Sequence, residues 1–201
     1  GYDLVALRQG GYALVGYSNS SDGDASNNEG MHDHWVIRID AKGTLLWEKS
    51  FGFAGHDHAY NIIATPDGGF FFNGFLDVTA SGGAGQDGKG AAVNRHGVGE
   101  FWAQKIDAQG NLLWRNYYGG TNNDRSYDAL LTTDGNYLLV GTSESQDVDI
   151  SQPKGSYDIW IVKINPRGKL LWERSFGGSA YDSAVAAIEH PPGNYMVVGQ
   201  S

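Results

Sequence analysis

Hydrophobic and polar positions alternate along this chain in short runs that end at glycine-containing turns. The run 159–165 has a period of two, which is typical of a β-strand. A Pro-Arg-Gly turn at 166–168 separates it from a second β-rich run, 170–175. Two further runs, 184–189 and 195–199, flank a Pro-Pro-Gly-Asn turn. One unit of the chain is therefore predicted to contain four antiparallel strands joined by tight turns.

The same pattern recurs along the chain. Glycines that close a β-rich run are separated by 58, 67 and 58 residues, and they are Gly16, Gly74, Gly141 and Gly199. Tryptophans form two registers with spacings of 67 and then 58 residues: Trp35, Trp102 and Trp160 in one, Trp47, Trp114 and Trp172 in the other. The unit with the longer spacing carries a Gly/Ala-rich insertion within Ser81–Gly90. These spacings indicate a tandem array.

A period of this size built from short strands predicts an all-β fold, a β-propeller of four-stranded antiparallel blades. The single propeller region 1–201 divides into units of approximately 1–54, 55–121, 122–179 and 180–201, about three and a half blades. Small residues share one position in the first strand, which suits the crowded axis of a ring: Ala59, Ser126 and Ala184. Trp47, Trp114 and Trp172 are expected to be buried at equivalent positions between adjacent blades.

Three and a half blades are too few for a closed ring, because propellers typically have four to eight. Two arrangements remain open. The sequence is either a fragment of a longer chain with six to eight blades, or half of a ring that two copies complete. Open sheet edges are normally covered, which favours the fragment.

Composition limits the partners. A net charge of −9 and a pI near 4.9 argue against nucleic acid, whose binding depends on Lys and Arg. No apolar run reaches the roughly 18 residues of a membrane span, so membrane insertion is not expected. The chain has no cysteine, so thiol chemistry is excluded and the redox compartment is left open.

Between Asp158 and Gly178 the repeat unit contains the motifs Asp-x-Trp-φ-x-Lys-φ-Asn, Gly-x-Leu-Leu-Trp and Phe-Gly-Gly. In these motifs the repeat unit resembles the propeller repeats of large secreted bacterial surface proteins. Its Gly-x-Leu-Leu-Trp part is also similar to the tryptophan-containing turn of quinoprotein propellers. The first resemblance implies secretion or a cell-surface location, a multidomain context and stabilisation by calcium. The second unit departs from the pattern, because Glu100 stands where Asp33 and Asp158 stand elsewhere.

Two acidic loops lie between the second and third strands of their units with identical spacing. Ca²⁺ prefers six to eight oxygen ligands, and Asp-x-Asp-x-Ser offers several in one loop. Asp and Ser also bond their own backbone in turns. The loops therefore serve either calcium binding or turn formation, and the candidate calcium ligands are Asp22, Asp24 and Ser26 in one loop and Asp147, Asp149 and Ser151 in the other.

Further polar residues recur at equivalent positions. Each of Asp57, Asp124 and Asp182 follows a blade-to-blade crossing and is expected to accept hydrogen bonds from its backbone N–H groups. Asp3, Asn61 and Asp128 share one position on the innermost strand. They are candidates to line a central channel and hold water or a cation, and ordinary solvation of a strand edge is the alternative.

Histidines occur in two His-Asp-His sequences, at 32–34 and 56–58. Two histidines at i and i+2 on a strand point to one face and can chelate zinc. The central aspartates recur without histidines in other units, which favours the interpretation that the imidazoles are local additions on exposed crossings.

No catalytic triad and no phosphate-binding loop stands out, so we predict that the chain is not an enzyme. The favoured function is a non-catalytic scaffold or adhesive binding module for a protein or glycan, on a secreted or cell-surface bacterial protein. The alternative is a carbohydrate-active propeller enzyme with its site in the atypical second unit, where Asp77 and Asp87 are candidates. An intracellular scaffold is a third possibility.

Overall fold

The computed structural model describes residues 1–86 and 96–201. The secondary-structure elements of these residues are all β-strands. They are β1 (Asp3–Ala6), β2 (Tyr12–Ser18), β3 (Asp33–Ile39), β4 (Leu45–Phe51), β5 (His58–Ala64), β6 (Phe70–Asp77), β7 (Gly99–Ile106), β8 (Leu112–Tyr118), β9 (Asp124–Leu131), β10 (Tyr137–Ser143), β11 (Asp158–Ile164), β12 (Leu170–Phe176), β13 (Ser183–Glu189) and β14 (Tyr195–Gln200). No helix in the described residues is long and apolar enough to cross a membrane. The all-β class is confirmed.

Within each sheet, strands that follow one another in the chain pair antiparallel. They form a first sheet of β1–β4, a second of β5–β8, a third of β9–β12 and a terminal hairpin of β13–β14. Tight turns make this pairing possible. In the β5–β6 turn, Gly68 donates its N–H to the carbonyl of Thr65 at 2.9 Å and has a φ of +85°, which glycine adopts without steric cost. The predicted four-stranded antiparallel meander is confirmed.

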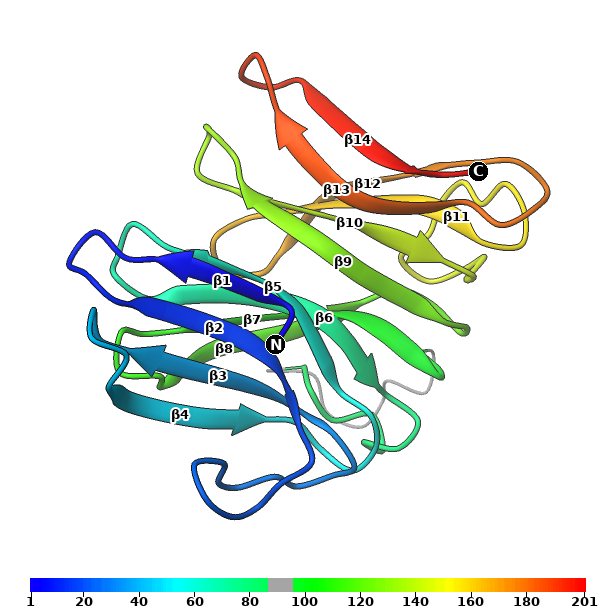
Figure 1. The fold of residues 1–201 in the computed structure, drawn as a ribbon. Helices are drawn as coiled ribbons and strands as arrows, with labels where there is room; N and C mark the ends of the chain where they lie inside the picture. Colours follow the sequence, from blue (N-terminus) through cyan, green and yellow to red (C-terminus); the bar gives the residue numbers. More distant parts are fainter. Residues whose placement is uncertain (87–95) are drawn as a thin grey trace.

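The first strands of the four units lie together on one side of the molecule (Figure 1). Strand β9 contacts both β5 and β13, and β5 also contacts β1. The small residues that predicted this position are fully buried where neighbouring strands approach: Ala59, Ser126 and Ala184. The remaining strands of each sheet extend away from this inner row in sequence order.

Each inner strand of the last three units has a register shift at one residue. In β5 the pairing with β6 passes from Ala59 directly to Asn61, so Tyr60 has no partner in the ladder. Tyr127 and Val185 are bypassed in the same way in β9 and β13. A β-bulge bends the strand and re-aims the extra side chain. The rings of Tyr60 and Tyr127 consequently lie 5.5 Å apart across the inner row.

Adjacent sheets pack face to face through apolar side chains. Ala13, Val15 and Val36 of the first sheet pack with Phe70 and Phe72 of the second. A second core between the second and third sheets contains Phe71, Phe101, Leu139, Trp160 and Val162. The terminal hairpin packs on the other face of the third sheet, so both faces of the second and third sheets are covered. Strand β6 is apolar at almost every position for this reason.

On the outer faces of the first sheet and the terminal hairpin, side chains are exposed at positions whose repeat equivalents in the third sheet are buried. Met196 is 61% exposed and Val198 56% exposed, whereas their repeat equivalents Leu138 and Val140 are fully buried. On the first sheet Tyr12 is 43% exposed, and its equivalent Tyr137 is buried. The two faces thus have the apolar character of surfaces that pack against another sheet.

The tryptophans of the fourth strands differ in part from the prediction. Trp47 and Trp114 do lie between sheets, where their indole N–H groups donate to the carbonyl oxygens of Ala108 (3.2 Å) and Pro166 (3.0 Å) in the next sheet's outer turn. They and Trp172 are only partly buried, however, so the prediction of full burial was wrong. Each ring lies at the outer end of its sheet, where the turn covers one face. The fully buried indoles are Trp102 and Trp160.

Candidate functional site

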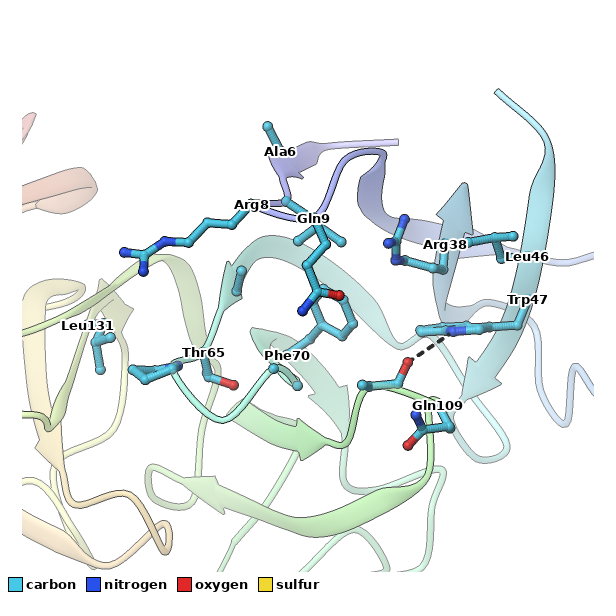
Figure 2. Close-up of a pocket in the computed structure, with 16 residues that line it drawn as sticks. Ala6, Arg8, Gln9, Arg38, Leu46, Trp47, Thr65, Phe70, Gln109 and Leu131 are labelled. Carbon is cyan, nitrogen blue, oxygen red and sulfur yellow. Dashed lines mark hydrogen bonds between the residues drawn. The ribbon is translucent and has the colours of Figure 1, made fainter. Parts of the chain in front are cut away.

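A cavity of about 740 Å³ opens between the turns of the first and second sheets. The β1–β2 turn, the β5–β6 turn and the β7–β8 turn surround it, and Trp47, Phe70 and Leu131 contribute apolar walls. Figure 2 shows Gln9 pointing into it above Phe70, with Arg38 near Trp47 and Arg8 extending toward the side of Leu131. The cavity therefore combines aromatic surface with amide and guanidinium groups.

The charge of this cavity is positive although the chain is acidic. Arg8 and Arg38 are the charged residues among those that line it. Arg38 donates to the carbonyl oxygens of Tyr12 (3.4 Å), Gly10 (3.3 Å) and Ile39, so its guanidinium group is held in place by backbone rather than by a carboxylate. Arginine in such a setting suits a ligand that carries a carboxylate or sulfate group.

In the other two sheets the residue equivalent to Arg38 is a lysine, and an aspartate neutralises its charge. Lys105 pairs with Asp67 at 2.9 Å, and Lys163 pairs with Asp134 at 2.5 Å. In the first sheet Gln9 stands where these aspartates stand. A missing aspartate in an otherwise repeated turn is the signal in the sequence that could have identified this cavity.

At the opposite ends of the inner strands, three histidines form a cluster between the first and second sheets. His32 precedes β3 and pairs with His56 through an isolated parallel bridge, and His58 begins β5. One ring nitrogen from each of the three lies within 4.8 Å of the others. The Nδ1 atoms of His32 and His56 are 2.6 Å apart. The ring of Tyr17 stacks on His58 with centroids 4.3 Å apart.

The cluster differs from the zinc hypothesis of the sequence analysis. That hypothesis paired His32 with His34 and His56 with His58. His56 and His58 do lie in one cluster. His34, however, is fully buried and contacts the carbonyl oxygen of Phe75 (3.2 Å) and the side chain of Gln104 (3.1 Å). His34 is therefore not a local addition on an exposed crossing. The structure instead brings His32 together with the two histidines of the next crossing. A search restricted to i and i+2 pairs could not find a group that spans two sheets.

Burial and neighbouring groups lower the pKa of two of these imidazoles, His32 and His58. Desolvation, followed by the nearby charges of His32, His56 and Arg125, lowers the pKa of His58 to about 4. Desolvation also lowers the pKa of His32, with His56 as a second cause. Neutral imidazoles retain a lone pair for a ligand at pH 7.

The three polar residues that share one position on the innermost strands are joined by hydrogen bonds. The side-chain amide of Asn61 donates to the carboxylates of Asp3 (3.2 Å) and Asp128 (3.0 Å). Each carboxylate also accepts a backbone N–H from the next inner strand, Ile62 for Asp3 and Ala187 for Asp128, both at 2.9 Å. The three residues connect the four units. A channel with water or a cation stays a prediction.

The two acidic loops are placed differently. The side chains of Asp22 and Asp24 are exposed, and Ser26 donates its hydroxyl to Glu48. In the third unit Asp147 accepts from the N–H of Thr121 (3.0 Å), and Ser151 donates its hydroxyl to Glu173 (2.5 Å). Both serines thus bind a carboxylate on the fourth strand of their own sheet.

Asp149 accepts the N–H of Gly119 at 3.2 Å, so the third-unit loop lies over the crossing between the second and third sheets. Beneath this crossing Glu100 is fully buried, with its Oε1 3.4 Å from Nδ1 of His96. Burial, followed by the charges of Asp124 and Asp149, raises the pKa of Glu100 well above its usual range. More carboxylates are consequently gathered at the third-unit loop than at the first-unit loop.

The repeated aspartates at the crossings serve the backbone, as predicted. Asp57 accepts the N–H of Phe53 at 2.8 Å, Asp124 that of Gly120 at 2.8 Å, and Asp182 that of Gly178 at 2.8 Å. Burial raises the pKa of Asp57 to about 7 and that of Asp124 to about 6, while the hydrogen bonds that they accept act in the opposite direction. These carboxylates are structural.

The enzyme alternative relied on two aspartates of the second unit. Asp77 accepts the N–H of Ala80 at 2.8 Å and so closes the turn after β6. Asp87 and the end of the insertion, residues 87–90, lie outside the described residues. Neither Glu100 nor Asp124 lines the cavity between the first and second sheets.

Comparison with protein-family models and with curated proteins found no match for this chain.

Proposed function

We propose that the chain is part of a β-propeller that acts as a non-catalytic binding module for an acidic glycan. The observation that carries this proposal is the cavity lined by Arg8, Arg38 and Trp47, which has no acidic lining residue in a chain of net charge −9. Aromatic faces and guanidinium groups are the side chains that bind sugar rings and their carboxylates. In the second and third sheets the equivalent turns carry aspartates that neutralise the nearby lysines, so the turn of the first sheet is distinct.

The propeller itself is supported by three repeated meanders around one row of inner strands. The exposed apolar faces at Tyr12 and at Met196 correspond to buried faces between neighbouring sheets. Further units of the same protein, or a second copy, would cover both faces and continue the ring. The resemblance of the repeats supports a secreted or cell-surface bacterial protein, and fractionation of the producing cells tests that location.

The glycan proposal is tested by isothermal titration with an oligogalacturonate, a sugar chain with one carboxylate per residue. Arg8→Gln is expected to weaken binding about 10- to 100-fold, because each charged hydrogen bond contributes about 1.5–3 kcal/mol. Gln9→Asp, which restores the residue found at Asp67 and Asp134, should abolish binding by neutralising Arg38. Both effects follow from charge in the cavity.

Arg167→Gln is the matched control, since it removes the same charge from an exposed turn of the third sheet. A neutral cello-oligosaccharide should bind at least tenfold more weakly than the acidic one. Equal binding of both sugars by all variants would refute the proposal. Release of new reducing ends by the unmodified protein would establish the carbohydrate-active alternative instead.

Calcium is proposed as a stabilising ion of the third-unit loop, where Asp147 and Asp149 lie above Glu100. Addition of about 1 mM Ca²⁺ to chelator-treated protein should raise the melting temperature by several degrees, because binding to the folded state alone is stabilising. Asp147→Asn should remove this shift, whereas Asp22→Asn in the first loop should leave it intact. Identical melting curves with Ca²⁺, Mg²⁺ and chelator would show that the loop serves turn formation only.

A further inference from the structure

We propose that His32, His56 and His58 bind one Zn²⁺ ion at the junction of the first and second sheets. Their three ring nitrogens lie within 4.8 Å of one another, and all three side chains are partly exposed. An ion can therefore reach the cluster from solvent. Zinc sites with three protein nitrogens and one open position are a recurrent arrangement.

The distances fit such a site after a small adjustment. A tetrahedral ion with Zn–N bonds of about 2.0–2.1 Å holds its nitrogen ligands about 3.3 Å apart. The Nδ1 atoms of His32 and His56 are now 2.6 Å apart, a hydrogen-bond distance, so they need to separate by less than 1 Å. The site requires rotation of the partly exposed side chains of His32 and His56, and a closer approach of the His58 nitrogen, which lies within 4.8 Å of theirs.

His58 is prepared as the third ligand. Its Nε2 atom is buried and has no hydrogen-bond partner, whereas its Nδ1 lies 3.3 Å from the hydroxyl of Tyr60. A contact to the second nitrogen is what orients a ligating imidazole in most metal sites. The stacked ring of Tyr17 holds the imidazole plane from the other side. A metal ion would satisfy the orphaned nitrogen.

The donor set selects the class of metal. Three imidazoles without a carboxylate suit Zn²⁺ and the later transition metals, and they do not suit Ca²⁺ or Mg²⁺, which prefer oxygen. The carboxylates adjacent to these histidines in the sequence, Asp33 and Asp57, accept hydrogen bonds from the backbone N–H groups of Glu29 and Phe53. The fourth position is consequently left for water or a donor atom from outside the chain.

The other two junctions show that the cluster is not required by the fold. The residues equivalent to His32 and His56 are Gly99 and Asn123 at the second junction, and Tyr157 and Tyr181 at the third. Each pair forms the same parallel bridge. The scaffold therefore accepts several residue types at these positions, and the histidines add an ion that connects β3 to β5.

The test uses tag-free protein, titrated with Zn²⁺ by calorimetry and followed by its melting temperature. We expect one ion per chain and a rise in melting temperature of about 5–10 °C when free Zn²⁺ reaches 100 times its Kd. Co²⁺ should bind at the same site and give the visible absorption of a four-coordinate ion. His56→Asn should weaken Zn²⁺ binding at least about 100-fold, more than loss of an outer-shell contact.

The double variant His32→Tyr/His56→Tyr copies the third junction and keeps the fold testable, because its melting temperature in chelator should match that of the unmodified protein. It should bind no Zn²⁺. His190→Asn, in the exposed turn of the terminal hairpin, should bind like the unmodified protein. Unchanged Zn²⁺ affinity in both cluster variants, or loss of binding in His190→Asn, would overturn the proposal.

Discussion

Trp160→Ala is expected to lower the free energy of unfolding by about 3 to 5 kcal/mol, the cost of deleting a large side chain from a packed core. Its indole is fully buried between the second and third sheets, with the ring of Phe101 4.7 Å away. Its N–H donates to Glu173 at 2.9 Å, and that carboxylate is itself buried. Alanine leaves both a cavity and an unsatisfied acceptor. Denaturation in urea, with the midpoint and slope compared, measures the loss.

Trp35 is the internal control, because it occupies the same position on the first sheet. It makes the same hydrogen bond, to Glu48 at 2.8 Å, but it is only partly buried on a face that no sheet covers. Trp35→Ala should therefore cost about 1 to 2 kcal/mol. Equal losses of unfolding free energy for the two variants would show that burial between sheets does not determine how much a tryptophan at this repeat position stabilises the fold.

The repeats made most of the fold predictable from the sequence. Period-two runs and Gly-containing turns identified the strands, and the small residues Ala59 and Ser126 identified the inner row. These features are local or repeated, so one unit supports the interpretation of the next. The partial burial of Trp114 was missed, because spacing alone does not show how much of a ring its neighbouring turn covers.

The candidate sites were less predictable because they arise where units differ and where two sheets meet. His32 and His56 are 24 positions apart in the chain, and their contact follows from the parallel bridge at the crossing. Arg38 is not paired with a turn residue as Lys105 is, because Gln9 stands in the β1–β2 turn where the other sheets have an aspartate. Departures from the repeat are thus better indicators of function in this chain than its recurring residues.

Glu100 marks another such departure, at the junction of the second and third sheets. In the other two sheets the equivalent Asp33 and Asp158 each accept a backbone N–H from four residues earlier at 2.6 Å. The longer Glu100 is buried beside Asp124 and Asp149, and burial followed by these charges raises its pKa well above the usual range. The folded state therefore binds this proton more tightly than the unfolded state does.

A raised folded-state pKa makes the protein less stable as pH increases. The contribution is fully present below the unfolded pKa of about 4.3 and is lost as pH rises through the folded value. Asp124, whose pKa burial raises to about 6, acts in the same direction. His34 and His58, whose pKa values burial lowers to about 3 and about 4, act in the opposite direction up to about pH 6.5. The Glu100 contribution is therefore measured as the difference in melting temperature between the unmodified protein and Glu100→Gln from pH 4.5 to pH 8.

Glu100→Gln removes the charge but keeps the shape of the side chain. It is expected to stabilise the protein by about 1 to 4 kcal/mol at pH 8, because burial disfavours the charged carboxylate and one pKa unit corresponds to about 1.4 kcal/mol, and to have little effect at pH 4.5. Calorimetric melting curves across this pH range measure the difference, with Glu29→Gln as an exposed control. If the melting temperatures of Glu100→Gln and the unmodified protein change with pH in parallel, the folded state stabilises the charge of Glu100.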